Sequence, residues 1–377
     1  MSSMRPSPSG YAWEPTDEHV AASYGIPLER VLRFDLNTSP APPPLAARIL
    51  ASGEFGRSVS DYPPSDYRRL AEAAAAVYAV EPSQVLVGAG ADEVLDIVAK
   101  TWLPPGGTAV IPQPTYSMYR VLTEQRPARA VQVPRLGPAS GHALDLEATR
   151  SAARGADLVW LCDPNNPTGR LEADGAIDAL LEGLAADARA DDRTPPVVVI
   201  DEAYAEFAGR ERADLERGYP HLLLVRTLSK AYALAGIRVG FALGPRPLIA
   251  AMEPYRPPGS LAVPSVAIGA AALRDRQAML ANVALVSGER DRLATELSVM
   301  GWSVAPASTT NFVLVDLGSV ERATAVVAGL GREGLVPRTF PGGHPLASHL
   351  RLTARGPADN ERLLAAMRTL VTAEVLP

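Results

Sequence analysis

The chain has 377 residues, of which 47% are hydrophobic, and a formal net charge of −6 at pH 7. This length predicts two domains, and the acidic balance argues against nucleic acid or an anionic membrane surface as partner. There is no signal-peptide core, no apolar run of about 18 residues that would span a membrane, and only one cysteine, Cys162. We therefore expect a cytoplasmic protein with reduced thiols.

In chain order, the proline-rich residues 1–45 are expected to form an irregular arm that joins the smaller, C-terminal domain. From residue 68 onward, short apolar runs alternate with helical patterns. Strands are expected at 84–90, 108–112, 128–134, 157–164, 196–203, 221–229 and 237–244, and helices at 68–80, 91–103, 115–126 and 171–189. This alternation predicts an α/β large domain over 46–264, with a mostly parallel sheet covered by helices on both faces.

The pattern changes after residue 264. A long helical stretch is followed by a strand at 311–317, a helix near 321–333, a strand at 349–354 and a terminal helix. Residues 265–377 are therefore expected to form a smaller α+β domain.

Polar residues follow four of the strands expected in the large domain. They are Gly-Ala-Asp at 90–92, Asn-Asn-Pro-Thr-Gly at 165–169, Asp-Glu-Ala-Tyr at 201–204 and Ser-Lys at 229–230. Ligands of open α/β sheets bind at the carboxyl ends of the strands, and the helix that opens at residue 90 could receive a phosphate at its N-terminus. Taken singly, each segment also has an ordinary interpretation, as a first-turn acid or a turn.

Other nucleotide and metal sites are excluded by the motifs that they require. A P-loop needs Gly-Lys-Ser/Thr, but Ala99 and Ser229 precede the two lysines, and Glu93 stands where a dinucleotide fingerprint has its third glycine. The five histidines are scattered and lack metal-ligand spacing, so we expect no metal.

The use of lysine singles out one residue. Of 36 basic residues only Lys100 and Lys230 are lysines. Lys100 lies in a helical pattern and is expected to be solvated, whereas Lys230 follows an apolar strand. Lysine, unlike arginine, can lose its proton and attack a carbonyl, and burial with a nearby cation such as Arg238 would favour the neutral amine. Lys230 is therefore a candidate for Schiff-base chemistry.

The segments GADE, PTY, DPNNPTG, VVVIDEAY, TLSKAYALAGIRVGF and LRLT occur in this order over nearly the whole chain. In this set the chain resembles the fold type I pyridoxal-phosphate (PLP) aminotransferases, and it is most similar to the histidinol-phosphate aminotransferase family of amino-acid biosynthesis. The resemblance implies transfer of an amino group from histidinol phosphate or a similar donor to 2-oxoglutarate. An aromatic amino-acid aminotransferase and a phosphothreonine-type PLP decarboxylase are the alternatives. A non-catalytic protein of this fold would be favoured by loss of Lys230 or Asp201, and both are present.

The resemblance also implies catalytic roles. Lys230 would bind the cofactor as an imine and then move the proton during the reaction, and Asp201 would pair with the pyridine nitrogen. Asn166 and Tyr204 would hydrogen-bond the phenolic oxygen, and Tyr116 would stack on the ring.

Further residues are implied to hold the cofactor phosphate. Gly90, Ala91 and Asp92 would bind it at a helix N-terminus, and Ser229 and Arg238 would supply a hydroxyl group and a cation.

The remaining expectations concern the partner subunit and the substrate. Tyr62 resembles the tyrosine that reaches the cofactor phosphate of the neighbouring subunit, which implies a homodimer. Arg351 matches the substrate-anion arginine, and Arg338 matches a second arginine that helps to bind the substrate phosphate. Asn37 is kept from the family's Asn-Glu-Asn-Pro signature next to the substrate, but the two residues that follow it differ, which leaves the substrate open.

Overall fold

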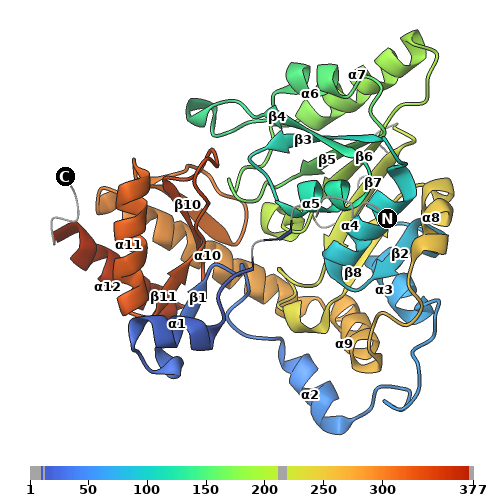
Figure 1. The fold of residues 1–377 in the computed structure, drawn as a ribbon. Helices are drawn as coiled ribbons and strands as arrows, with labels where there is room; N and C mark the ends of the chain where they lie inside the picture. Colours follow the sequence, from blue (N-terminus) through green and yellow to red (C-terminus); the bar gives the residue numbers. More distant parts are fainter. Residues whose placement is uncertain (1–9, 12, 211–218, 373–377) are drawn as a thin grey trace, which may run out of the picture.

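A computed structural model describes residues 10–11, 13–210 and 219–372 of the chain. A seven-stranded sheet forms the larger part, and the C-terminal elements lie to one side of it (Figure 1). In spatial order the sheet consists of β2 (Val85–Gly88), β8 (Gly240–Leu243), β7 (Leu222–Thr227), β6 (Val197–Asp201), β5 (Leu158–Cys162), β3 (Thr108–Gln113) and β4 (Arg129–Pro134).

The sheet is mostly parallel, as predicted. Strands β4, β3, β5, β6 and β7 pair in parallel, and β8 runs antiparallel to both of its neighbours, β7 and β2. Because successive side chains of a strand point to opposite faces, Ile200 joins one buried cluster and Val199 the other. Burial on both faces explains why these strands read as continuous apolar runs.

Helices cover both faces of this sheet. They are α3 (Arg68–Tyr78), α4 (Gly90–Trp102), α5 (Met118–Gln125), α6 (Leu146–Ala152), α7 (Ala176–Ala190), α8 (Arg246–Met252) and α9 (Val263–Arg274). Short 3-10 turns lie at η1 (Leu28–Arg30), η2 (Pro82–Gln84), η3 (Pro138–Ser140), η4 (Ala205–Ala208), η5 (Ala235–Ile237) and η6 (Glu253–Tyr255). Across the described ranges, no helix combines the length and apolar character needed to cross a membrane.

Two small sheets form the C-terminal part. Strand β10 (Phe312–Asp316) pairs antiparallel with β9 (Ser303–Val304) and with β12 (His349–Thr353). Strand β1 (Leu32–Phe34) pairs in parallel with β11 (Leu335–Pro337). The helices of this part are α10 (Gln277–Val299), α11 (Val320–Arg332) and α12 (Pro357–Thr372). The pairing of β1 with β11 brings the residues just after β1 beside the C-terminal elements.

The N-terminal arm is more regular than the sequence predicted. Besides β1 and α2 (Pro44–Ser52), it contains helix α1 (Asp17–Tyr24), which the proline-rich composition concealed. The hydroxyl oxygen of Thr16 accepts a hydrogen bond from the His19 amide, and Gly25 ends the helix at φ 63°. These caps satisfy backbone groups at both ends, and the burial of Val20 and Ala21 adds the tertiary packing that so short a helix needs.

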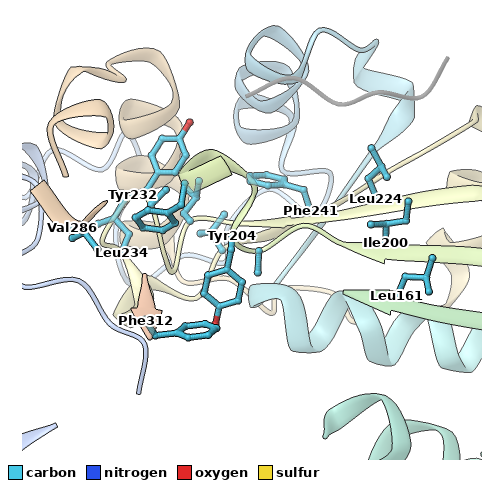
Figure 2. Packing of buried hydrophobic residues seen from close by; sticks show 14 of the residues in the cluster. Leu161, Ile200, Tyr204, Leu224, Tyr232, Leu234, Phe241, Val286 and Phe312 are labelled. Atoms are coloured by element: carbon cyan, nitrogen blue, oxygen red, sulfur yellow. The ribbon is translucent and has the colours of Figure 1, made fainter. Parts of the chain in front are cut away.

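Tyr204 connects the large sheet with the C-terminal part. It follows β6, and its ring packs edge-on against Phe312 of β10, with the centroids 5.5 Å apart (Figure 2). Both side chains are buried. The carboxyl end of β6 therefore faces β10, and the space between the two parts is where the polar loop ends meet.

Candidate active site

Lys230 lies just after β7, at the carboxyl edge of the large sheet. Its Nζ donates to the Asn37 carbonyl oxygen at 3.2 Å and lies 5.8 Å from the centre of the Tyr204 ring. Burial and the charge of Arg351, acting against the opposing charge of Asp92, lower the pKa of Lys230 to about 8. With such a pKa about one amine in ten is neutral at pH 7, far more than for an ordinary lysine.

Asp201 ends β6 and is buried. Its Oδ2 accepts the Tyr119 hydroxyl hydrogen at 2.8 Å, and its Oδ1 accepts from the Ala203 amide at 3.1 Å. Burial raises the pKa of Asp201 to about 6, although the Tyr119 hydrogen bond acts in the opposite direction. A buried carboxylate of this kind is suited to a cationic N–H partner, which would keep it ionised.

Tyr119 is a residue that the sequence reasoning missed. Its ring stacks on Trp160 with centroids 5.4 Å apart and planes at 8°, which fixes the hydroxyl group on Asp201. The signal was the second tyrosine of the QPTYSMY segment, three positions after Tyr116, whose ring packs edge-on against that of Tyr119 with the centroids 5.6 Å apart.

Asn166 and Tyr204 are brought together with Asn37. Asn166 Oδ1 accepts from Arg351 Nη1 at 2.6 Å, and Tyr204 Oη accepts from Asn37 Nδ2 at 2.8 Å. Each keeps a hydrogen-bond donor of its own, the Asn166 amino group and the Tyr204 hydroxyl hydrogen. Asn37 has φ 52°, a left-handed conformation that asparagine tolerates, and its Oδ1 accepts from Thr353 Oγ1 at 3.1 Å.

A cradle forms at the N-terminus of α4, where the residues Gly90 and Ala91 have backbone N–H groups without helical partners. Gly90 has φ 80°, and a Cβ at this position would collide with the Arg238 guanidinium. A Cβ at Gly240 would collide with the backbone of Gly90. Two glycines are therefore required for β8 and Arg238 to approach the helix end closely.

Side chains complete this cradle. Arg238 Nη2 lies 3.2 Å from Asp92 Oδ2, and its Nη1 donates to Ser229 Oγ at 3.4 Å. Tyr116 donates its hydroxyl hydrogen to Asp92 Oδ1 at 2.9 Å, which holds its ring beside the cradle. Thr227, another residue missed from the sequence, donates to Ser229 Oγ at 2.9 Å. A cation, a hydroxyl group and a helix N-terminus at one point suit a phosphate group.

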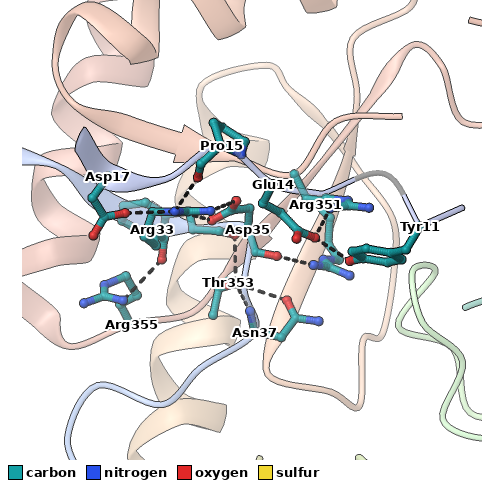
Figure 3. Close-up of polar contacts among 12 residues, drawn as sticks. Tyr11, Glu14, Pro15, Asp17, Arg33, Asp35, Asn37, Arg351, Thr353 and Arg355 are labelled. Carbon is teal, nitrogen blue, oxygen red and sulfur yellow. Dashed lines mark hydrogen bonds and ion pairs between the residues drawn. The ribbon is translucent and has the colours of Figure 1, made fainter. Parts of the chain in front are cut away.

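The expected substrate arginines are neighbours. Arg338 and Arg351 form an isolated antiparallel bridge, with both backbone N–O distances at 3.0 Å. Arg351 is buried, and its Nη2 donates to the Asp35 carbonyl oxygen (Figure 3). Arg338 Nη1 contacts the Glu14 carboxylate.

Tyr62 is the one expected residue that is not brought to the others within the single chain. Its side chain is 85% exposed on the segment between α2 and α3. A role for Tyr62 in the site therefore requires a second copy of the chain.

An amine with a lowered pKa, a buried carboxylate and a phosphate cradle at one sheet edge fit the aldehyde, ring nitrogen and phosphate of PLP. They define a fold type I PLP-dependent transaminase. The chain belongs to the aminotransferase class I and II family, whose model matches residues 34–367.

Within this class, the chain is similar to histidinol-phosphate aminotransferases. It is 33% identical to the enzyme of Roseiflexus castenholzii, over 93% of this chain and 92% of that one. It is 34% identical to the enzyme of Symbiobacterium thermophilum, over 90% of this chain and 91% of that one. The crystal structure of histidinol-phosphate aminotransferase from Sinorhizobium meliloti in complex with pyridoxal-5'-phosphate has a TM-score of 0.85 and 25% identity, covering 96% of both chains.

Proposed function

We propose that this transaminase moves an amino group from a doubly anionic donor, histidinol phosphate or a close analogue, to 2-oxoglutarate. The observation that carries the proposal is the backbone bridge between Arg338 and Arg351, which places these two arginines directly opposite each other. Two guanidinium groups suit a donor with two anionic charges, whereas a single one suffices for an amino-acid carboxylate. The names of the similar proteins support the same donor.

Bound PLP supplies an aldehyde that captures amines and a ring that withdraws electrons from the substrate carbon. Lys230 is proposed to hold the cofactor covalently through Nζ and, once released, to carry a proton on that atom. A lowered pKa favours both roles, because the neutral amine is the nucleophile and the base.

Asp201 is proposed to hold the ring nitrogen in its protonated form. The Tyr119 and Ala203 hydrogen bonds fix both carboxylate oxygens, so that Asp201 does not turn away from its partner. The cradle of Gly90, Ala91, Asp92, Ser229 and Arg238 is proposed to bind the phosphate, with Tyr116 covering the ring. These contacts would orient the cofactor against Lys230.

Arg351 is proposed to bind the anion of the substrate that lies next to the cofactor. Asn166 and the Asp35 carbonyl oxygen hold two of its nitrogen atoms, and the guanidinium carbon lies 5.2 Å from the centre of the Phe312 ring. An arginine held in this way loses little conformational freedom when a substrate binds. Asn37, in contact with both Lys230 and Tyr204, would close the same pocket.

The protein is proposed to act as a homodimer. Three large apolar or aromatic side chains are exposed on α2 and the segment after it: Tyr62, Val59 and Leu50, at 85%, 70% and 57%. A second copy that covers these side chains would bury them and bring Tyr62 to the cradle of the other subunit.

A scan of amino donors tests the proposal. Purified holoenzyme is mixed with histidinol phosphate, histidinol or phenylalanine, and the absorbance of the lysine-bound cofactor is followed until it disappears and is restored by 2-oxoglutarate. Histidinol phosphate is expected to have the highest kcat/KM. A higher value for phenylalanine would replace the proposed donor with an aromatic amino acid, and release of carbon dioxide from phenylalanine without amino transfer would indicate a decarboxylase.

A further inference from the structure

The carboxylate of Glu14 pairs with Arg338, one of the two proposed substrate arginines. Arg338 Nη1 donates to Glu14 Oε1, and Tyr11 donates its hydroxyl hydrogen to the same oxygen at 2.5 Å. The Arg338 guanidinium carbon lies 5.9 Å from the centre of the Tyr11 ring. Figure 3 shows Tyr11 directed at Glu14, on the stretch that precedes α1. The N-terminal segment therefore lies directly on Arg338.

The positive charge of the neighbouring arginine, Arg351, is not balanced by a carboxylate of the described residues. Within the described ranges, Arg351 pairs with no carboxylate, and its hydrogen-bond acceptors, Asn166 Oδ1 and the Asp35 carbonyl oxygen, are neutral. The side chains of Arg338 and Glu14 are only 23% and 20% exposed, so water weakens their attraction less than that of a surface pair. One arginine thus keeps its full charge for a ligand, and the charge of the other is balanced by the chain.

Glu14 carries a negative charge at neutral pH. Burial opposes ionisation of this carboxyl group, but hydrogen bonds from Tyr11 and from the Glu14 backbone amide, with the Arg338 charge, together lower its pKa. A phosphate or a second carboxylate at Arg338 would meet this charge at close range, and like charges at one site repel each other.

We propose that Glu14 is a specificity-determining residue, an internal anion that must leave Arg338 before the doubly charged anionic group of a donor can bind both arginines. The proposal rests on the proposed function, because it takes Arg338 as the anchor of that group. A donor whose anionic group carries a single charge uses Arg351 and leaves Glu14 in place. Glu14 therefore weakens binding of doubly anionic donors relative to singly anionic ones.

Kinetics of matched variants test this role. Glu14→Gln keeps the shape of the side chain and removes its charge, whereas Glu18→Gln removes a charge from an exposed position on α1 and serves as control. In Glu14→Gln holoenzyme the KM for histidinol phosphate is expected to fall about tenfold, the scale of one charge-assisted contact. The KM for histidinol should change less than about twofold in both variants, since histidinol carries no anionic group that competes with Glu14 for Arg338.

Calorimetric titration of the same holoenzymes with inorganic phosphate separates this proposal from the proposed function. If none of the proteins converts histidinol phosphate, the proposed donor is wrong, but the titration still decides on Glu14. Phosphate affinity about tenfold higher in Glu14→Gln and Glu14→Ala than in Glu18→Gln supports the role. Equal affinities in all proteins with unchanged melting temperatures, or an equal gain for histidinol, would overturn it.

Discussion

Replacing Arg351 with methionine should lower the activity strongly and change the thermal stability little. The side chain is buried, and it donates to two neutral acceptors without a paired carboxylate in the part of the chain that the structure describes. Methionine has a similar length and no charge, so the variant removes the guanidinium without leaving a large cavity.

The expected changes in stability and in kcat/KM follow from the contacts of Arg351. Loss of the hydrogen bonds to Asn166 and the Asp35 carbonyl oxygen costs roughly 1.5–3 kcal/mol each. Removing a buried charge that has no partner recovers several kcal/mol of desolvation free energy, so the two effects nearly cancel. The midpoint of thermal unfolding is therefore expected to change by less than about 5 °C. The value of kcat/KM should fall about 150-fold, because a bidentate contact worth about 3 kcal/mol is lost.

The assay measures kcat/KM and thermal unfolding of Arg351→Met, Arg351→Lys and the exposed control Arg332→Met. Lysine keeps the positive charge but cannot donate two parallel hydrogen bonds to one anion as a guanidinium does, so kcat/KM should fall about tenfold. If Arg351→Met retains more than about a tenth of the wild-type kcat/KM, Arg351 does not bind the substrate anion in the way proposed here. A large loss of thermal stability would instead assign Arg351 a structural role.

Three further outcomes are expected. Lys230→Arg should abolish transamination and the borohydride-reducible attachment of the cofactor, as measured by mass spectrometry of the digested protein, because arginine keeps the charge but not the nucleophile; a labelled peptide in the variant would disprove the assignment. The rate at which apoenzyme takes up PLP should rise about tenfold per pH unit below the Lys230 pKa of about 8 and level off above it, since only the neutral amine reacts; in Arg351→Met the midpoint should move to higher pH, and a profile that is flat between pH 6 and 9 would refute the lowered pKa. Mixing inactive Lys230→Ala with Tyr62→Phe protomers should restore activity through hybrid dimers with one intact site, and an active species that sediments as a monomer would rule out the shared site.

The large sheet could be predicted from the sequence because its strands are buried on both faces. Runs such as Val197–Asp201 are apolar at nearly every position, and their carboxyl ends carry the polar residues that define the site. Helix α1 could not be predicted in this way, since its sequence DEHVAASY buries only Val20 and Ala21 and its ends depend on Thr16 and Gly25.

Most residues of the candidate site could be proposed from the sequence, but Tyr119 and Thr227 were missed, and the contacts between the residues could not be foreseen. Lys230 was singled out by the chemistry of its amine, and Asp201 and Arg351 were singled out by the resemblance to the PLP aminotransferases. The contact of Asn166 with Arg351 joins positions 185 residues apart, and that of Glu14 with Arg338 joins positions 324 residues apart. No local pattern encodes such distant pairs, because they depend on how the small sheets lie against the large one.

The pairing of β1 with β11 also sets an order of events during synthesis. Strand β1 leaves the ribosome among the first elements, but its partner exists only after residue 337 has been made. Until then the apolar side chain of Phe34, fully buried in the folded chain, has no strand to pair beside, and Asn37 has no fixed place next to Lys230. The large sheet contains no strand beyond residue 243 and can form earlier. A nascent chain therefore carries its proposed nucleophile long before the surrounding site is complete, and we expect the newly made enzyme to become competent only when its last third has folded back onto its first residues.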